Sequence, residues 1–76
     1  MKVYIKTVTP AYIETTNHSS QTKEFQLDFN VVEYDVHFNR MNKMTGTATI
    51  PADIDSIDAM REIIYNQIQK GLNAKD

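Results

Sequence analysis

Apolar and polar residues alternate along three stretches of this chain, which is the period-2 pattern of half-buried β-strands. Residues 2–8 alternate first, residues 25–38 alternate next, and residues 43–50 resume the pattern after a polar turn at residues 39–43. The short polar turn between the last two stretches is typical of a β-hairpin, whose strands run antiparallel. The pattern therefore predicts an antiparallel sheet of at least three strands.

The apolar residues of the long stretch 25–38 fall into two phases, which would point to opposite faces of a flat strand. The first phase contains Phe25, Leu27, Phe29 and Val31, and the second contains Val32, Tyr34, Val36 and Phe38. A β-bulge within residues 30–33 would restore a single phase by inserting one extra residue. A second chain that covers the exposed half of the strand would serve equally well, and both alternatives stay open.

Residues 57–72 carry apolar side chains every three or four positions, which predicts an amphipathic C-terminal helix. The apolar stripe consists of Ile57, Met60, Ile63, Ile64, Ile68 and Leu72. Candidate N-caps are Asp53, Asp55 and Ser56. Gly71 is the candidate C-cap. The small residues Gly46 and Ala48 leave space on the inner face of the third strand, and we expect the helix to fill it.

Two segments lack any pattern that predicts regular structure. Residues 14–24 contain no apolar side chain, so we predict a flexible polar loop there, and we expect residues 73–76 to fray. The chain as a whole, residues 1–76, is expected to be one small α+β domain with the element order β-β-β-α. Its sheet has three strands, or four if Tyr12 and Ile13 form a short extra one, with a long β-hairpin and one helix on one face.

Composition and charge narrow the class of protein. The 76 residues are 41% hydrophobic and 24% charged, which fits one small globular domain. The absence of cysteine excludes disulfides, thiolate metal sites and thiol nucleophiles, and is compatible with a reducing cytosol. No run approaches the ~20 apolar residues that a membrane span needs. The sequence therefore predicts a cytoplasmic protein, and its net charge of −2 weighs against nucleic-acid binding.

The best metal-like cluster is Glu33, Asp35 and His37, which alternate along one strand and so share a face. Carboxylates and imidazole are competent ligands for zinc or manganese. A solvated sheet face explains the same three residues more simply. We therefore expect no metal and no other cofactor.

Catalytic signatures are also missing from the sequence. His18 stands beside Ser19 and Ser20, but neighbours in a loop do not form a catalytic triad. Gly46 and Gly71 are isolated, so there is no glycine-rich phosphate loop. We therefore expect a protein that is not an enzyme.

A nucleic-acid interface is the alternative function. Lys2, Tyr4 and Lys6 form an outward row that interleaves charge with an aromatic ring, as platforms for single strands do. Arg40 and Lys43 in the predicted hairpin add a second basic patch. Lysines also protect edge strands against aggregation. This explains Lys2 and Lys6 about as well as nucleic-acid binding does.

Protein binding is the function that the sequence favours. Residues 25–38 carry more large apolar side chains than one helix can cover. Exposed apolar surface of this kind is typical of interfaces. We expect a small interaction module that forms a homodimer and binds a larger protein, a role common among phage, prophage and bacterial accessory proteins. Its predicted interface contains the hairpin residues Arg40, Met41 and Lys43 and the apolar anchors Phe29, Tyr34 and Phe38.

Overall fold

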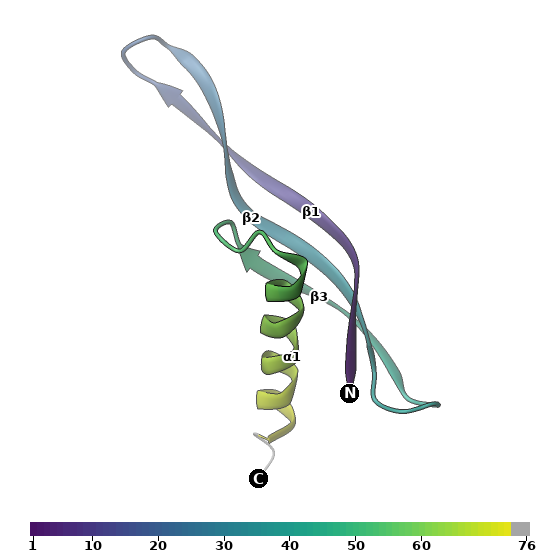
Figure 1. Ribbon diagram of the computed structural model, residues 1–76. Coiled ribbons are helices and arrows are strands. Elements are labelled where there is room, and N and C mark those ends of the chain that lie inside the picture. The colour runs from purple at the N-terminus through teal and green to yellow at the C-terminus, as the bar shows by residue number, and fades with distance from the viewer. Residues whose placement is uncertain (74–76) are drawn as a thin grey trace.

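The computed structural model describes residues 1–73, which form one antiparallel sheet and one helix (Figure 1). The elements follow the order β1 (Lys2–Asn17), β2 (Thr22–His37), β3 (Lys43–Pro51) and α1 (Ile57–Asn73). The order in the sheet is β1-β2-β3, so β2 is central and both β1 and β3 are edge strands. The predicted α+β fold with the order β-β-β-α is confirmed, and Tyr12 and Ile13 belong to β1 rather than to a fourth strand.

The first hairpin is much longer than its apolar pattern predicts. β1 and β2 each contain 16 residues, and only residues 18–21 form the turn between them. The predicted flexible loop over residues 14–24 is therefore wrong, because most of that segment is paired strand. A two-stranded ribbon with water on both faces has no buried face, so its residues need not alternate between apolar and polar. The β-branched residues Thr15 and Thr16 favour an extended backbone there.

A β-bulge at Lys6 changes the phase of β1. Ile5 pairs with Tyr34 and Thr7 pairs with Glu33, so Lys6 is the extra residue. The bulge brings Val8 to the same face as Ile5, where it packs against the core. Strict alternation would have placed Val8 on the opposite face.

A second bulge lies in β2, at Asp28. Ala11 pairs with Phe29 and Tyr12 pairs with Leu27, so Asp28 is the extra residue. The alternative of a β2 bulge within residues 30–33 is therefore wrong, because these four residues pair with β1 and β3 without an extra residue in β2. From Phe29 onward β2 pairs with β3 without any shift in register.

The core lies between the sheet and α1, which covers one face (Figure 1). It consists of Val3, Val32, Val36, Ile50, Met60 and Ile64. The middle of the predicted helical stripe is therefore buried. Ile57 and Leu72, at the two ends of that stripe, are 45% and 48% exposed.

The helix begins as predicted and ends later. The backbone N–H of Ala59 donates to Ser56 Oγ at 3.1 Å, which identifies Ser56 as the N-cap. Gly71 lies within α1 and has no positive φ, so the predicted C-cap there is wrong. The fraying predicted for residues 73–76 falls on the last helical residue and on residues outside the described part of the chain. Within that part, no helix has the length and apolarity needed to cross a membrane.

The space beside Gly46 is filled by a side chain of the sheet itself. Tyr34 pairs with Gly46 across β2 and β3, and a Cβ atom on Gly46 would stand 2.5 Å from Tyr34 Oη. The expectation that the helix fills this space is therefore wrong at Gly46. The aromatic ring instead covers the glycine of an edge strand, an arrangement that stabilises designed sheets as well.

The molecule is elongated because the hairpin of β1 and β2 extends beyond the rest of the sheet (Figure 1). β3 ends at Pro51, which pairs with Phe29, and Phe29 pairs with Ala11, so residues 12–28 project beyond both β3 and the core. We call these residues the arm. The principal extents are 56 × 26 × 17 Å and the Cα radius of gyration is 16.5 Å. A compact domain of this length would have a radius of gyration of about 11 Å.

Candidate protein interface

The arm exposes large apolar side chains on both of its faces. Tyr12 pairs with Leu27 and Glu14 pairs with Phe25, so Tyr12, Leu27 and Phe25 share one face. Phe25 is 70% exposed and Tyr12 is 59% exposed. Ile13, on the other face, is 43% exposed. Apolar groups this accessible, on a projecting ribbon, are available for contact with another molecule.

Tyr12, Ile13 and Phe25 were not among the predicted interface residues, because the adjoining residues 14–24 were assigned to a loop. Thr15 and Thr16 before residues 17–21, and Thr22 after them, are the signal that could have predicted a hairpin. The turn itself combines asparagine with two serines, which are typical turn residues.

The tip of the arm is held by backbone and side-chain hydrogen bonds of Asn17. Its carbonyl oxygen accepts from the N–H of Gln21 at 2.6 Å, and its Oδ1 accepts from the N–H of Ser19 at 2.9 Å. Gln21 adopts a left-handed conformation with φ 55°, which closes the turn. An ion pair between Lys23 and Glu14, with Nζ and Oε1 3.4 Å apart, links the two strands farther along the arm.

The second hairpin, between β2 and β3, presents the predicted contact residues Arg40, Met41 and Lys43. All three are exposed, and Met41 is 87% exposed. Asn39 Oδ1 accepts hydrogen bonds from the backbone N–H groups of Met41 at 2.9 Å and of Asn42 at 3.0 Å. The turn is therefore ordered by its own side chain, and it holds Met41 out toward solvent.

The three predicted aromatic anchors lie in different surroundings. Tyr34 and Phe38 pack against the core cluster, so they hold the fold together and are poorly placed as exposed anchors. Phe29 is half-buried at the base of the arm, where it pairs with Ala11 and Pro51. The structure does not bring these three aromatic side chains together on one surface.

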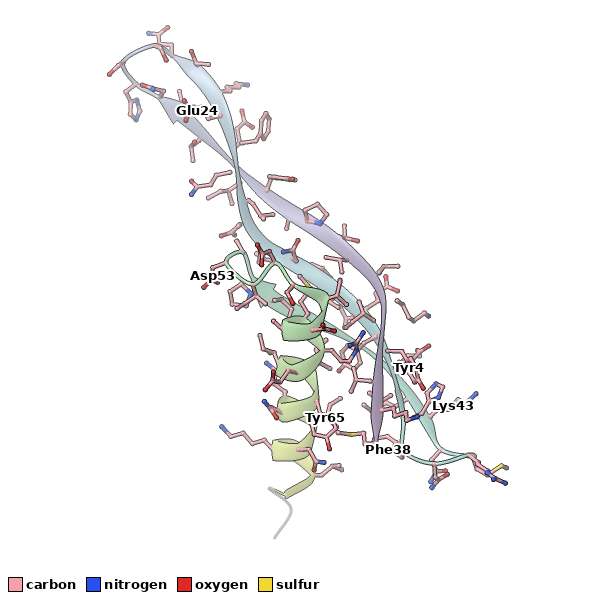
Figure 2. The ribbon with its side chains drawn as sticks, in the orientation of Figure 1. Tyr4, Glu24, Phe38, Lys43, Asp53 and Tyr65 are labelled. Atoms are coloured by element: carbon pink, nitrogen blue, oxygen red, sulfur yellow. The ribbon has the colours of Figure 1, made fainter. Side chains whose placement is uncertain are left out.

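The sheet register brings several residues of the alternative nucleic-acid site together. Lys2 pairs with His37 and His37 pairs with Lys43, so these three side chains form a row across the sheet. The ring of Tyr4 lies 4.7 Å from that of His37 at an interplanar angle of 51°. Figure 2 shows Tyr4 and Lys43 near the same end of the sheet. Lys6 lies farther along β1, at the bulge.

Acidic groups interrupt this basic surface. Glu33 and Asp35 lie on the same face as His37, since they alternate with it along β2. Asp35 Oδ1 is buried and has no hydrogen-bond partner among the described residues. The described residues contain no group of three or more histidine, cysteine or acidic side chains that could hold a metal ion.

Two hollows of about 270 and 370 Å³ open on the surface of the described residues. The smaller is lined by Lys6, Glu33, Tyr34, Thr45, Gly46 and Thr47, and the larger by Met1, Lys2, Val3, Tyr4, Arg61 and Tyr65. His18, Ser19 and Ser20 line neither hollow and are exposed in the turn of the arm.

Comparison of the chain with protein-family profiles, with curated proteins and with solved structures finds no match. Its function is therefore argued from its own geometry.

Proposed function

We propose that this chain is a small non-enzymatic interaction module, of the kind found among phage and bacterial accessory proteins, that forms a homodimer and binds a larger protein through the arm. The observation that carries the proposal is the projection of the arm beyond the core with Tyr12 and Phe25 exposed on one face. Aromatic residues are the side chains most enriched where protein interfaces gain their binding energy.

Covering the arm would release a substantial amount of free energy. Fully burying a large apolar side chain contributes about 1.5–3 kcal/mol relative to leaving it in water. Phe25 is 70% and Tyr12 is 59% exposed, so most of this contribution is still available from both side chains. Two such anchors on a short ribbon are enough to dominate a protein interface.

The arm is also independent of the core. None of the six buried core residues lies within residues 12–28. A two-stranded hairpin is only marginally stable by itself in water, since neither face is covered. A partner that covers one face would therefore stabilise the arm while leaving the rest of the fold unchanged.

The turn between β2 and β3 offers a second point of contact. This turn, which contains Arg40 and Met41, lies at the end of the sheet opposite to the arm (Figure 1). Methionine and arginine are both enriched at interfaces, and Met41 is held in place by Asn39. A large partner could touch both ends, but the arm offers the larger apolar surface.

The proposal is tested by affinity capture with three tagged baits from a lysate of the native host, after nuclease treatment. The baits are the unmodified chain, an arm variant with Tyr12→Thr and Phe25→Thr, and a turn variant with Met41→Thr as the matched control. Threonine keeps strand propensity while removing the aromatic surface. Thermal unfolding followed by circular dichroism checks that all three baits are folded.

We expect the unmodified chain and the turn variant to retain one defined protein that the arm variant loses. Retention of the same protein by the arm variant would contradict the assignment of the arm. Loss with the turn variant alone would transfer the interface to Arg40, Met41 and Lys43. Recovery of no defined protein by the unmodified chain would reject protein binding as the function.

The row Lys2, His37 and Lys43, with Tyr4 against His37, favours single-stranded nucleic acid as a second candidate ligand. Fluorescence anisotropy with a labelled single-stranded oligonucleotide tests it. On this alternative, Lys2→Glu with Lys43→Glu abolishes binding, whereas Lys70→Glu on α1 does not. Absence of binding by the unmodified chain at low salt, where such contacts are strongest, would discard it.

A further inference from the structure

Among the described residues, the outer edge of β3 differs from the other free strand edges, because it has no charged side chain between its two terminal residues and no irregularity. Residues 44–50 contain no charged side chain. β3 pairs with β2 over nine residue pairs without a shift in register, so its backbone is regular. In the described residues its other edge has no neighbouring strand. An edge of this kind is open to pairing with another strand.

The remaining free edges carry the features that block such pairing. β1 has lysines at residues 2 and 6, a bulge at Lys6 and a proline at residue 10. The free part of β2, within the arm, has Lys23, Glu24 and the bulge at Asp28. Charges, bulges and prolines are the usual means by which proteins protect edge strands. β3 lacks them between its terminal residues Lys43 and Pro51.

The sequence of β3 is also complementary to itself when one copy is turned by a two-fold axis through Thr47. Antiparallel pairing of two copies in this register would place Thr47 opposite Thr47, Thr45 opposite Thr49, and Met44 opposite Ile50. Gly46 would lie opposite Ala48. Within residues 44–50 each residue then meets one of similar size and polarity on the same face, and threonine pairs across strands are favourable. A closed two-fold contact of this kind produces a dimer and no longer assembly.

We propose that two copies of the chain pair through β3, antiparallel and centred on Thr47, to form one continuous six-stranded sheet. This inference deepens the proposed function, because it supplies the contact of the homodimer. The two-fold axis reverses the strand direction, and each arm extends past the Pro51 end of its own β3. The two arms therefore project from opposite ends of the shared sheet, and the dimer presents two equivalent binding surfaces.

The size of this contact sets the concentration range of the test. Nine paired residues extend about 30 Å, and a sheet edge is about 10 Å thick, so each copy buries about 300 Å². The total of about 600 Å² is below that of standard stable interfaces. We therefore expect a dimer with a dissociation constant in the micromolar range, measured by sedimentation equilibrium between about 5 and 500 μM.

Charge at position 47 tests the register directly. Glu33 pairs with Thr47 across β2 and β3, so Thr47→Asp would align four acidic side chains across the proposed contact. Like charges brought together at an interface cost several kcal/mol, so the dissociation constant should rise at least about tenfold. A mixture of Thr47→Asp with Thr47→Lys should recover the dimer as a mixed pair. Thr9→Asp on β1, which is also an exposed threonine, is the matched control and should leave the dimer unchanged.

A cross-linking variant gives an independent measurement. The chain has no cysteine, so Thr47→Cys introduces a single thiol. In the proposed register two such thiols face each other and should form an intermolecular disulfide under mild oxidation, whereas Thr9→Cys should not. Circular dichroism of each variant verifies that it is folded.

A monomeric unmodified chain at about 500 μM would overturn the proposal, since this is well above the micromolar dissociation constant expected. A dimer that Thr47→Asp leaves intact, with no Thr47→Cys cross-link, would overturn the β3 contact. Neither result bears on the arm, because affinity capture by the Tyr12 and Phe25 variants does not need the dimer. Failure of the dimer and failure of partner binding are thus distinguishable.

Discussion

The contact between Gly46 and Tyr34 makes a sharp prediction about the two glycines of this chain. Adding a Cβ atom at Gly46 would place it 2.5 Å from Oη and 2.6 Å from Cζ of Tyr34. Separations under 3.0 Å do not occur for real Cβ atoms, so the Tyr34 ring or the strand must move. A Cβ atom added at Gly71, by contrast, would meet nothing within 4 Å. The same Gly→Ala substitution should therefore have opposite effects at the two positions.

The magnitudes follow from packing and backbone freedom. Overpacking beside a half-buried ring costs about 1–3 kcal/mol. Replacing glycine by alanine within a strand recovers about 0.5–1 kcal/mol, because alanine loses less backbone entropy on folding. Gly46→Ala should thus destabilise the fold by about 1 kcal/mol, which lowers the melting temperature by about 4–8 °C in a domain this small. Gly71→Ala, inside α1, should stabilise it by about 0.5–1 kcal/mol.

The assay is urea unfolding followed by circular dichroism, with all variants at one protein concentration because the stability of a dimer depends on concentration. Tyr34→Leu removes the phenol ring from Gly46 and completes a double-mutant cycle. In the Tyr34→Leu background, Gly46→Ala should no longer destabilise the protein. A Gly46→Ala variant that is as stable as the unmodified chain would contradict the predicted clash with Tyr34. An effect of the same size with and without the Tyr34 ring would contradict it as well.

Three further substitutions test the described contacts by standard measurements. Ser56→Ala removes the N-cap of α1 and should lower the free energy of unfolding by about 1 kcal/mol. Asn39→Ala removes the acceptor for the N–H groups of Met41 and Asn42, and both amides should exchange with solvent faster while global stability changes little. Ile64→Ala opens a cavity at a residue that is 1% exposed and should cost about 2–5 kcal/mol in denaturant unfolding.

The parts of the fold that bury an apolar face were predictable from the sequence. The stripe of α1 repeats every three or four residues because one side of the helix meets the sheet, and Met60 and Ile64 are indeed buried. The inner strands alternate for the same reason. The arm was not predictable in this way, because both of its faces meet water and polar residues can occupy any position. Its pairing is set by strand propensity and by the turn at Asn17 rather than by burial.

The bulges show why the faces of individual residues were harder to predict than the strands. An extra residue at Lys6 or Asp28 reverses every face beyond it, and nothing in the local composition marks either position. The turn between β2 and β3 was predicted correctly, and Arg40 and Met41, which lie in it, are exposed. Tyr34 was predicted as an interface anchor. Its side chain instead packs against the core cluster and covers Gly46.

The free-energy balance of the arm favours its contact with another molecule. Ordering a residue costs about 1–2 kcal/mol in backbone entropy alone. In the core, hydrophobic burial offsets this cost, but the arm contributes no residue to the buried cluster. Its strands are held by cross-strand pairs, the Lys23–Glu14 ion pair and the turn, and exposed ion pairs contribute little. The arm is therefore the part of the fold whose stability has the most to gain from a covering surface, and its exposed Tyr12 and Phe25 are the side chains that such a surface would cover.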